Sequence, residues 1–262
     1  MKLSFIINAY DRPNYLENTL KTIKRQIRDD MEIIVVVDKT GTNMQELAEQ
    51  YGAQYYETTY RCGDIGTSQN VGAKMAIGEY LCLLDQDCIF HHDAVEKILY
   101  HISDKSDVRL LVEWCGPGVE FPDTKEKLDK FYFEDSIQRP RYGYVTHMPW
   151  GSVQILKREF FIQVGGFDER FRGYSETQRD FAARVGIGGW EKKSFYIDQI
   201  VSEQFHPPRE WQKEFQEIPE FKEHLDRLVN ERYDVAAMNG VEYSKGNLVV
   251  NQGVEWGVPA QL

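Results

Sequence analysis

Apolar runs of strand length alternate with segments of helical spacing in the first half of this chain, and this alternation constrains the fold most. Residues 3–7 form a short apolar run, and after a polar break the apolar residues of 15–23 recur at helical spacing. Residues 32–38 are rich in β-branched side chains and end in Asp38, as expected for a strand buried on both faces of a parallel sheet. The pattern predicts an α/β fold.

The same alternation continues toward the middle of the chain. Further strands are predicted at residues 53–57, 80–84 and 108–114, and further helices at 44–51 and 67–77. Strands that alternate with helices form a mainly parallel sheet flanked by helices, and ligands collect at the carboxyl ends of its strands. Asp38, Asp85 and Asp87, which follow predicted strands, are therefore expected at one edge of the sheet.

The second half of the chain has a weaker pattern. After residue 114 the alternation gives way to an irregular aromatic and charged stretch that ends near Pro149, as is typical of a substrate loop. A strand and then a helix are expected over 150–164. An exposed, mostly acidic helix is expected over 210–233.

Composition limits the class of protein. The net charge of −11 disfavours a broad electrostatic grip on nucleic acid, although a local basic groove stays open. No apolar run approaches the roughly 20 residues that a membrane-spanning helix needs, so we expect a soluble protein. The four cysteines form no C-x-x-C pair, which favours reduced thiols and a cytoplasmic location. They are Cys62, Cys82, Cys88 and Cys115.

The tripeptide Asp85-Gln86-Asp87 carries the most specific chemistry in the chain. Two carboxylates one residue apart at a strand end are hard oxygen ligands that suit a divalent cation. Such an ion acts as a Lewis acid and can stabilise a departing diphosphate. A solvated turn is the alternative interpretation, because aspartate is common where a strand stops.

Four segments together resemble family 2 glycosyltransferases in order and spacing. They are FIINAYDRP at 5–13, VVVD at 35–38, NVGA at 70–73 and GEYLCLLDQD at 78–87. The resemblance implies a GT-A fold and transfer of a sugar from a nucleotide diphosphate sugar, with a UDP-sugar favoured. It also implies Mn²⁺ or Mg²⁺ as the cofactor and a saccharide or other hydroxyl compound as the acceptor.

The resemblance also implies roles for single residues in the first half. Ala9, Tyr10 and Arg12 would contact the nucleotide base, and Asp38 would bond the base or the ribose. Asp85 would face the ribose and the metal, and Asp87 would be the direct metal ligand.

One position departs from the family pattern. Where members have Arg-Asn, this chain has Gln69-Asn70, so a cation is missing from the predicted donor site.

Histidines extend the predicted metal site. His206 lies where related GT-A enzymes place a late histidine, and imidazole suits Mn²⁺ beside two carboxylates. His91 and His92 follow Asp87 closely, but a solvated position at a helix start is the favoured interpretation for both.

A segment of the second half resembles the acceptor side of galactosyltransferase-like and chondroitin-synthase-like enzymes. It includes Trp150, Gly151 and Tyr174, which we expect to bind the acceptor or a sugar. Where those enzymes have Gly-Trp-Gly-Gly-Glu-Asp-x-Asp, residues 173–181 read GYSETQRDF, so the acids are displaced.

An inverting transferase needs a carboxylate that takes the proton of the acceptor hydroxyl. Glu176 is the preferred candidate, and Asp180 is the alternative. We expect inversion, with retention left open if neither acid acts as the base.

These expectations define a domain organisation. We predict a GT-A catalytic domain over 1–208, with a nucleotide-sugar-binding half at 1–115 and an acceptor-side half at 116–208. A helical C-terminal extension and tail would cover 209–262.

Two other functions fit the same pattern less well. A sugar nucleotidyltransferase would show a glycine-rich, basic first loop, which residues 8–13 lack. A non-catalytic carbohydrate- or nucleotide-binding module is suggested by Gln69 and the displaced acids, but the intact Asp85 and Asp87 weigh against it.

Overall fold

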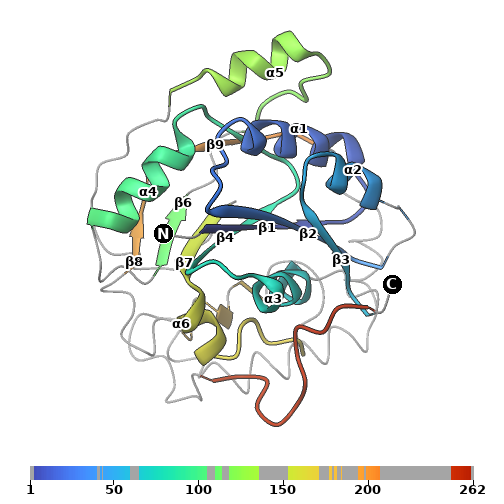
Figure 1. Cartoon of the computed structure of the whole chain (residues 1–262), viewed down its shortest axis with the longest axis vertical. Helices are drawn as coiled ribbons and strands as arrows, with labels where there is room; N and C mark the ends of the chain where they lie inside the picture. The colour runs from blue at the N-terminus through green and yellow to red at the C-terminus, as the bar shows by residue number, and fades with distance from the viewer. Residues whose placement is uncertain are drawn as a thin grey trace, which may run out of the picture.

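A seven-stranded sheet, parallel in most of its pairings, forms the centre of the chain (Figure 1). The computed structural model describes residues 3–39, 42, 44–59, 65–104, 110–113, 118–135, 153–170, 177–178, 180–181, 184, 194–197, 199–206 and 249–260. The strand order is β3-β2-β1-β4-β7-β6-β8. These strands are β1 (Leu3–Ala9), β2 (Met31–Val37), β3 (Gln54–Glu57), β4 (Tyr80–Asp85), β6 (Leu110–Glu113), β7 (Val153–Lys157) and β8 (Ser194–Tyr196).

The first four strands of this sheet run parallel, as the alternation with helices predicts. β7 is antiparallel to both of its neighbours, β4 and β6. The hydrophobic pattern of a buried strand does not encode its direction, so the sequence could not identify this exception. The prediction of a mainly parallel sheet flanked by helices is confirmed.

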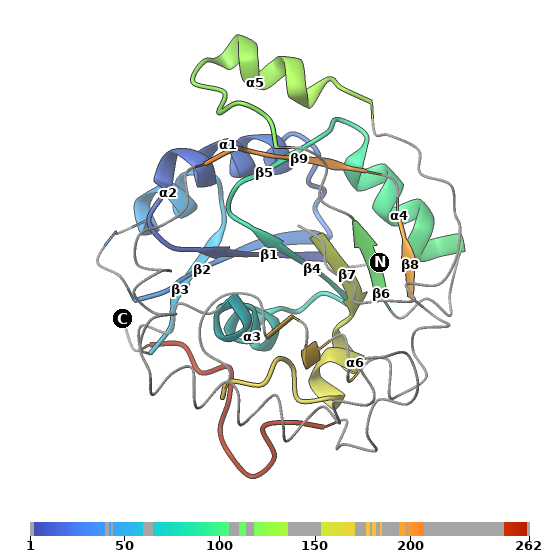
Figure 2. The same ribbon diagram turned by 180° about the vertical axis from the view of Figure 1, so that it is seen from behind.

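Helices cover both faces of the sheet (Figures 1 and 2). α1 (Pro13–Lys24), α2 (Gln45–Gln50) and α4 (Ala94–Asp104) lie on one face, and α3 (Ile65–Met75) and α6 (Arg158–Gln163) lie on the other. Side chains of β1 alternate between the two cores because successive residues of a strand point to opposite faces. Phe5 and Ile7 join the core beneath α1, and Ile6 joins the core beside α3.

A second, two-stranded sheet lies on the α1 side of the main sheet (Figure 2). It pairs β5 (Cys88–Phe90) with β9 (Val201–Glu203) in antiparallel register. α5 (Lys125–Tyr132) lies outside α1, where Arg25 Nη2 is 2.7 Å from Asp129 Oδ1. The expectation of an irregular stretch after residue 114 is wrong for α5, whose Thr124 side chain accepts a hydrogen bond from Lys127 N at the helix start.

The segment 249–260 packs against the domain beneath α3 (Figure 1). Val250 N donates to Val164 O, and Ala260 N donates to Glu57 O at the edge of β3. Lys74 Nζ lies 4.1 Å from the centre of the Trp256 ring. The expected acidic helix at 210–233 lies outside the described residues, and the division at residue 208 stays a prediction.

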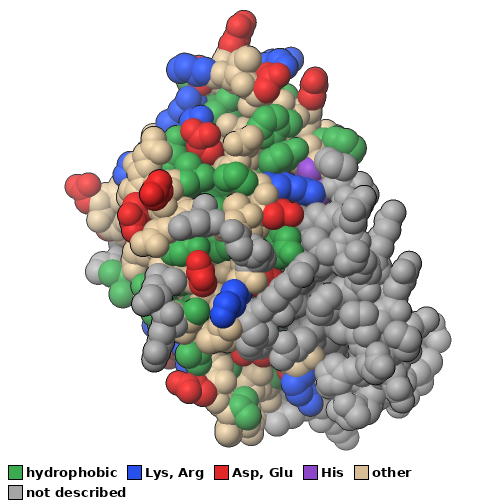
Figure 3. Space-filling view, turned by 90° about the vertical axis from the view of Figure 1, so that its right-hand side faces the viewer, with side chains coloured by type: hydrophobic (Ala, Val, Ile, Leu, Met, Phe, Trp, Pro, Cys, Tyr) green, Lys and Arg blue, Asp and Glu red, His purple; other side chains and the backbone are tan. Residues whose placement is uncertain are grey.

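The described surface carries side chains of both charges. On the face shown in Figure 3, lysines and arginines of the described residues are interspersed with acidic side chains. No helix within the described ranges is long and apolar enough to cross a membrane.

Cys82 and Cys88 are buried thiols, and Cys62 and Cys115 fall in segments that are not described.

Asn70 joins α3 to the turn that follows α6. Its Nδ2 donates to Phe167 O at 2.9 Å and to Glu169 Oε1 at 3.0 Å, while its Oδ1 accepts from Phe167 N at 2.9 Å. Gly166, at φ +65°, lies so close that a Cβ there would be 2.4 Å from Asn70 Oδ1. The turn therefore has its shape because glycine allows a left-handed backbone against this amide.

We expect Asn70→Ala to lower the free energy of unfolding by about 1 to 3 kcal/mol, because it leaves the buried N–H of Phe167 without its partner, while Phe167 O keeps the hydrogen bond from Asn251. Urea denaturation of both proteins measures this loss. Asn14→Ala, an exposed change on α1, is the control and should change stability by less than about 0.5 kcal/mol. An equal effect of the two substitutions would contradict the role given to Asn70.

Candidate functional site

Polar residues at the carboxyl ends of β1, β2 and β4 meet at one edge of the main sheet. Asn8 in β1 is in register with Asp85, the last residue of β4. Asp38 follows β2, and its backbone N donates to Ala9 O at 3.1 Å. Tyr10 N donates to Gln86 Oε1 at 3.0 Å, which ties the first loop to the Asp85-Gln86-Asp87 turn. The structure thus brings together the residues that the sequence assigned to this edge.

Beside this edge lies a cluster of three ligand-type side chains. Asp87 Oδ2 is 3.0 Å from His206 Nε2. One ligand atom each of Asp87, Glu203 and His206 lies within 4.8 Å of the other two. Carboxylate oxygens and one imidazole nitrogen form a donor set that suits Mn²⁺ or Mg²⁺ better than a thiol-seeking metal.

Backbone pairing fixes the relative position of the three side chains. The antiparallel pairing of β5 with β9 sets Cys88 opposite Glu203. Gln204 N donates to Asp87 O at 2.8 Å. This bond joins the segment with Glu203 and His206 directly to Asp87. The small sheet and this backbone bond therefore position the candidate ligands Asp87 and Glu203.

Gln204 also fastens this unit to α1. Its side chain is fully buried, and Nε2 donates to Tyr15 O at 3.1 Å while Oε1 accepts from Asn18 Nδ2 at 3.0 Å. Buried amides keep both kinds of hydrogen bond because an unpaired polar group in the interior costs free energy. Gln204 is thus a positioning residue between two candidate ligands.

Asp87 has a buried carboxylate with one oxygen that no hydrogen bond from the described part of the chain satisfies. Its side chain is only 5% exposed, and its Oδ1 has no hydrogen-bond partner among the described residues. A buried carboxylate oxygen without a partner is costly unless a positive charge compensates it. The cluster therefore fits a divalent cation on its own geometry and charge.

The other predicted donor residues have different surroundings. Asp38 is buried, and its Oδ1 accepts from Thr58 Oγ1 at 3.4 Å. Gln69 Nε2 donates to Asn8 Oδ1 at 3.1 Å, next to Asp85 across the strand pair. The guanidinium carbon of Arg12 lies 5.6 Å from the centre of the Tyr15 ring, at the start of α1.

Asn70 and Asp180 lie in the packed interior. Asn70 is fully buried in the contacts with the turn at 167–169. Asp180 is 1% exposed, and its Oδ2 is 2.7 Å from Arg184 Nε. Arg184 in turn donates to Gly166 O at 2.7 Å, so this ion pair supports the same turn as Asn70. The donor role of Asn70 and the base role of Asp180 stay predictions.

The remaining predicted acceptor residues lie outside the described part of the chain. They are Trp150, Gly151, Tyr174 and Glu176. Their roles therefore stay predictions as well.

The two histidines after Asp87 differ from each other. The expectation of a solvated position is wrong for His91, which is 1% exposed and has Nε2 3.0 Å from Ser202 Oγ. His92 is partly exposed, and its Nε2 lies 3.5 Å from Asp135 Oδ1. Burial lowers the pKa of His91 below its usual value, although Glu134 and Asp93 act in the opposite direction.

Sequence reasoning missed Glu203 and Gln204. The spacing Glu203-x-x-His206 was visible, but only three residues of β9 precede the turn, too few to show a strand period. The contact of this strand with β5 joins segments far apart in the chain. A buried glutamine gives no sequence signal at all.

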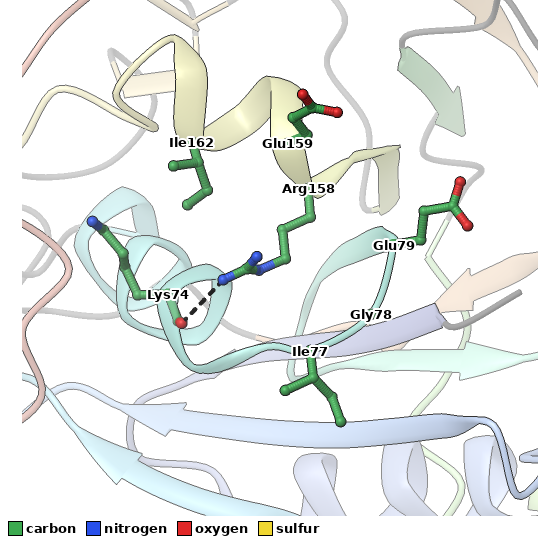
Figure 4. A pocket seen from close by; sticks show the side chains of 7 residues that line it. All are labelled: Lys74, Ile77, Gly78, Glu79, Arg158, Glu159 and Ile162. Carbon is green, nitrogen blue, oxygen red and sulfur yellow. Dashed lines mark hydrogen bonds between the residues drawn. The ribbon is translucent and has the colours of Figure 1, made fainter.

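A hollow at the opposite edge of the sheet is a separate feature (Figure 4). Its volume is about 750 Å³, and Gly78 and Glu79, which precede β4, form part of its wall. Arg158 lines it too, but its Nε and Nη2 donate to Ala73 O and Lys74 O at the end of α3. This arginine closes a helix end, which is a structural role.

Comparisons with known proteins show the family and the fold of the chain. Residues 4–165, more than half of the chain, match the family described as Glycosyl transferase family 2. EpsH of Bacillus subtilis, a protein named as a glycosyltransferase, is 24% identical over 186 residues, which are 68% of this chain and 53% of EpsH. The chain spans about half the length of the curated relatives it matches.

Solved structures are similar in fold. The crystal structure of S. aureus TarS 1–349 in complex with UDP-GlcNAc has a TM-score of 0.64 at 16% identity, covering 87% of this chain and 65% of that one. The mannosyltransferase PcManGT from Pyrobaculum calidifontis, in complex with GDP-Man and Mn²⁺, has a TM-score of 0.51 at 17% identity, covering 74% and 56%. The predicted GT-A fold is confirmed.

The family match ends at residue 165. The segment from Trp150 to Phe181 lies partly inside and partly beyond this match, and its resemblance to galactosyltransferase-like and chondroitin-synthase-like enzymes stays a prediction.

The buried His91 should make stability depend on pH. Its pKa in the folded protein is below the value of 6.5 of the unfolded chain, so the unfolded state binds the proton first as the pH falls. We expect the free energy of unfolding to fall between about pH 7.5 and about pH 5.5, and to fall less in His91→Gln. Urea denaturation at both pH values measures the two slopes.

Ser202→Ala is the matched control for this experiment. It removes the hydroxyl beside the ring but keeps the buried imidazole, so its pH slope should stay like that of the original protein. Equal slopes for His91→Gln and the original protein would show that another group causes the dependence.

Proposed function

The chain belongs to glycosyl transferase family 2, and from this premise we propose that it transfers a sugar from a nucleotide diphosphate sugar to a hydroxyl acceptor. The observation that carries the proposal is the cluster of Asp87, Glu203 and His206 beside the sheet edge that holds Asp38 and Asp85. A diphosphate leaving group needs positive charge, and this edge offers acids that can hold a cation.

The donor would bind along the carboxyl edge of β1, β2 and β4. Asp38 and the loop with Tyr10 would contact the base and ribose, and Asp85 would face the ribose and the metal. We favour a UDP-sugar, in keeping with the TarS complex with UDP-GlcNAc, which shares this fold. GDP is the alternative because PcManGT binds GDP-Man.

Asp87, Glu203 and His206 would hold Mn²⁺ or Mg²⁺. The ion, when bound, supplies a Lewis acid for the diphosphate oxygens. The protein itself contributes fixed ligand positions, because β5 and β9 pair through their backbones and Gln204 bonds to α1. A site that does not need to rearrange loses less free energy on binding.

The acceptor side rests on Glu176, which we propose as the base that takes the proton from the acceptor hydroxyl. Asp180 is the alternative base, but its ion pair with Arg184 would have to open before it could accept a proton. A base of this kind corresponds to an inverting reaction.

We expect UDP to bind the purified protein in a manner that depends on Mn²⁺, and Asp87→Asn to weaken that binding by about tenfold or more. Asp87→Asn keeps the size of the side chain and removes its charge. Calorimetric titration with UDP and with GDP, each with and without Mn²⁺, measures the effect. It also shows which nucleobase, uracil or guanine, the protein binds.

Asp123→Asn is the matched control, because Asp123 is exposed beside α5 and lies outside the metal cluster. It should bind UDP like the original protein. Failure to bind either nucleotide under any metal condition would contradict the proposal. Metal-dependent binding without transfer to any acceptor and without hydrolysis of UDP-sugars would favour a non-catalytic binding module instead.

A further inference from the structure

We propose that Glu203 is a third protein ligand of the cation and that, through it, the chain binds the cation before the nucleotide diphosphate. This inference rests on the proposed function but goes beyond it, because sugar transfer requires only that the ion be present with the donor. It concerns the order of binding and the residue that determines it.

The geometry fits one ion with three protein ligands. Neighbouring ligands of an octahedral ion with bond lengths of about 2.1 Å lie about 3 Å apart, and opposite ligands about 4.2 Å apart. The distance of 3.0 Å between Asp87 Oδ2 and His206 Nε2 corresponds to a neighbouring pair. The limit of 4.8 Å that encloses all three ligand atoms leaves room for Glu203 in the same coordination sphere after a small adjustment.

The negative charge of Glu203 decides whether the protein alone can neutralise the ion. Asp87 alone would leave a divalent ion with a net positive charge beside a carboxylate that is only 5% exposed. Asp87 and Glu203 together balance the two charges of the ion, and the imidazole of His206 adds a neutral donor. With the charge balanced by protein, the ion does not need the diphosphate for neutralisation.

The buried oxygen of Asp87 is a second and independent observation. Its Oδ1 has no hydrogen-bond partner within the described segments, although the side chain is more than nine-tenths buried. Such an oxygen gains from a cation whether or not a nucleotide is bound. It therefore points to a metal that is held by the free protein.

The fixed position of the ligand strands supports the same order. Gln204 N donates to Asp87 O, and Val119 N donates to Glu203 O at 2.7 Å, so backbone bonds restrain both carboxylate-bearing residues. Little conformational entropy is then lost when the ion binds. The diphosphate adds further oxygen ligands to the ion and so should raise the affinity for the metal. Because coupling between two ligands is reciprocal, the bound metal should raise the affinity for the diphosphate by the same factor.

Glu203→Gln tests the proposal because it keeps the side-chain size and removes the charge. In the absence of nucleotide, we expect it to weaken Mn²⁺ binding by about tenfold or more. With saturating UDP the loss should be smaller, because phosphate oxygens supply the missing negative ligands. The EPR signal of free Mn²⁺ during titration of the full chain measures both affinities without any turnover.

Glu120→Gln is the matched control. Glu120 is exposed and follows Val119, which forms a bridge with Gln204, so it lies beside the cluster without belonging to it. Its Mn²⁺ affinity should equal that of the original protein. Urea denaturation of both variants shows whether a loss of binding comes from unfolding.

The outcomes separate this inference from the proposed function. Mn²⁺ binding by the free protein that Glu203→Gln weakens and Glu120→Gln leaves unchanged supports the inference. Mn²⁺ binding only with UDP present, or an unchanged affinity in Glu203→Gln, overturns the inference and leaves the transferase proposal standing. No binding of Mn²⁺ or UDP under any condition overturns both.

Discussion

The backbone hydrogen bond from Gln204 N to Asp87 O, together with the pairing of β5 and β9, is the interaction on which the site depends. It brings a carboxylate that follows β4 to within 3.0 Å of a histidine from the second half of the chain. Neither half can form this arrangement alone. The sheet edge that holds Asp38 and Asp85 is tied to the Asp85-Gln86-Asp87 turn, so the candidate donor residues and the cluster lie at the same end of the sheet.

Much of the first half of the molecule could be predicted from the sequence. β1, β2 and β4 are apolar runs buried on both faces, and strand ends in such sheets collect at one edge, so Asp38 and Asp85 fall where expected. The short strands β5 and β9 could not be predicted, because three residues carry no period and their pairing joins distant segments. Glu203 was missed for that reason. His91 was misjudged because its burial depends on that same small sheet.

The turn after α6 shows a second way in which the halves are joined. Asn70 from α3, Arg184 and the backbone of the segment 249–260 all bond to residues 164–169. Asn251, at φ 55°, donates to Gly165 O and Phe167 O. Long-range bonds of this kind leave little trace in local patterns, since buried polar residues are distributed by tertiary contacts and not by period. They hold the polypeptide that leads toward the predicted acceptor residues.

We propose that a divalent cation and a nucleotide diphosphate meet at the carboxyl end of β4. Anomalous diffraction at the manganese edge from crystals grown with Mn²⁺ and UDP tests it most directly. We predict one strong peak in contact with Asp87, Glu203 and His206, with the diphosphate on its open side. A nucleotide bound without metal, or bound in the hollow beside Lys74 and Arg158 at the opposite edge, would contradict the claim.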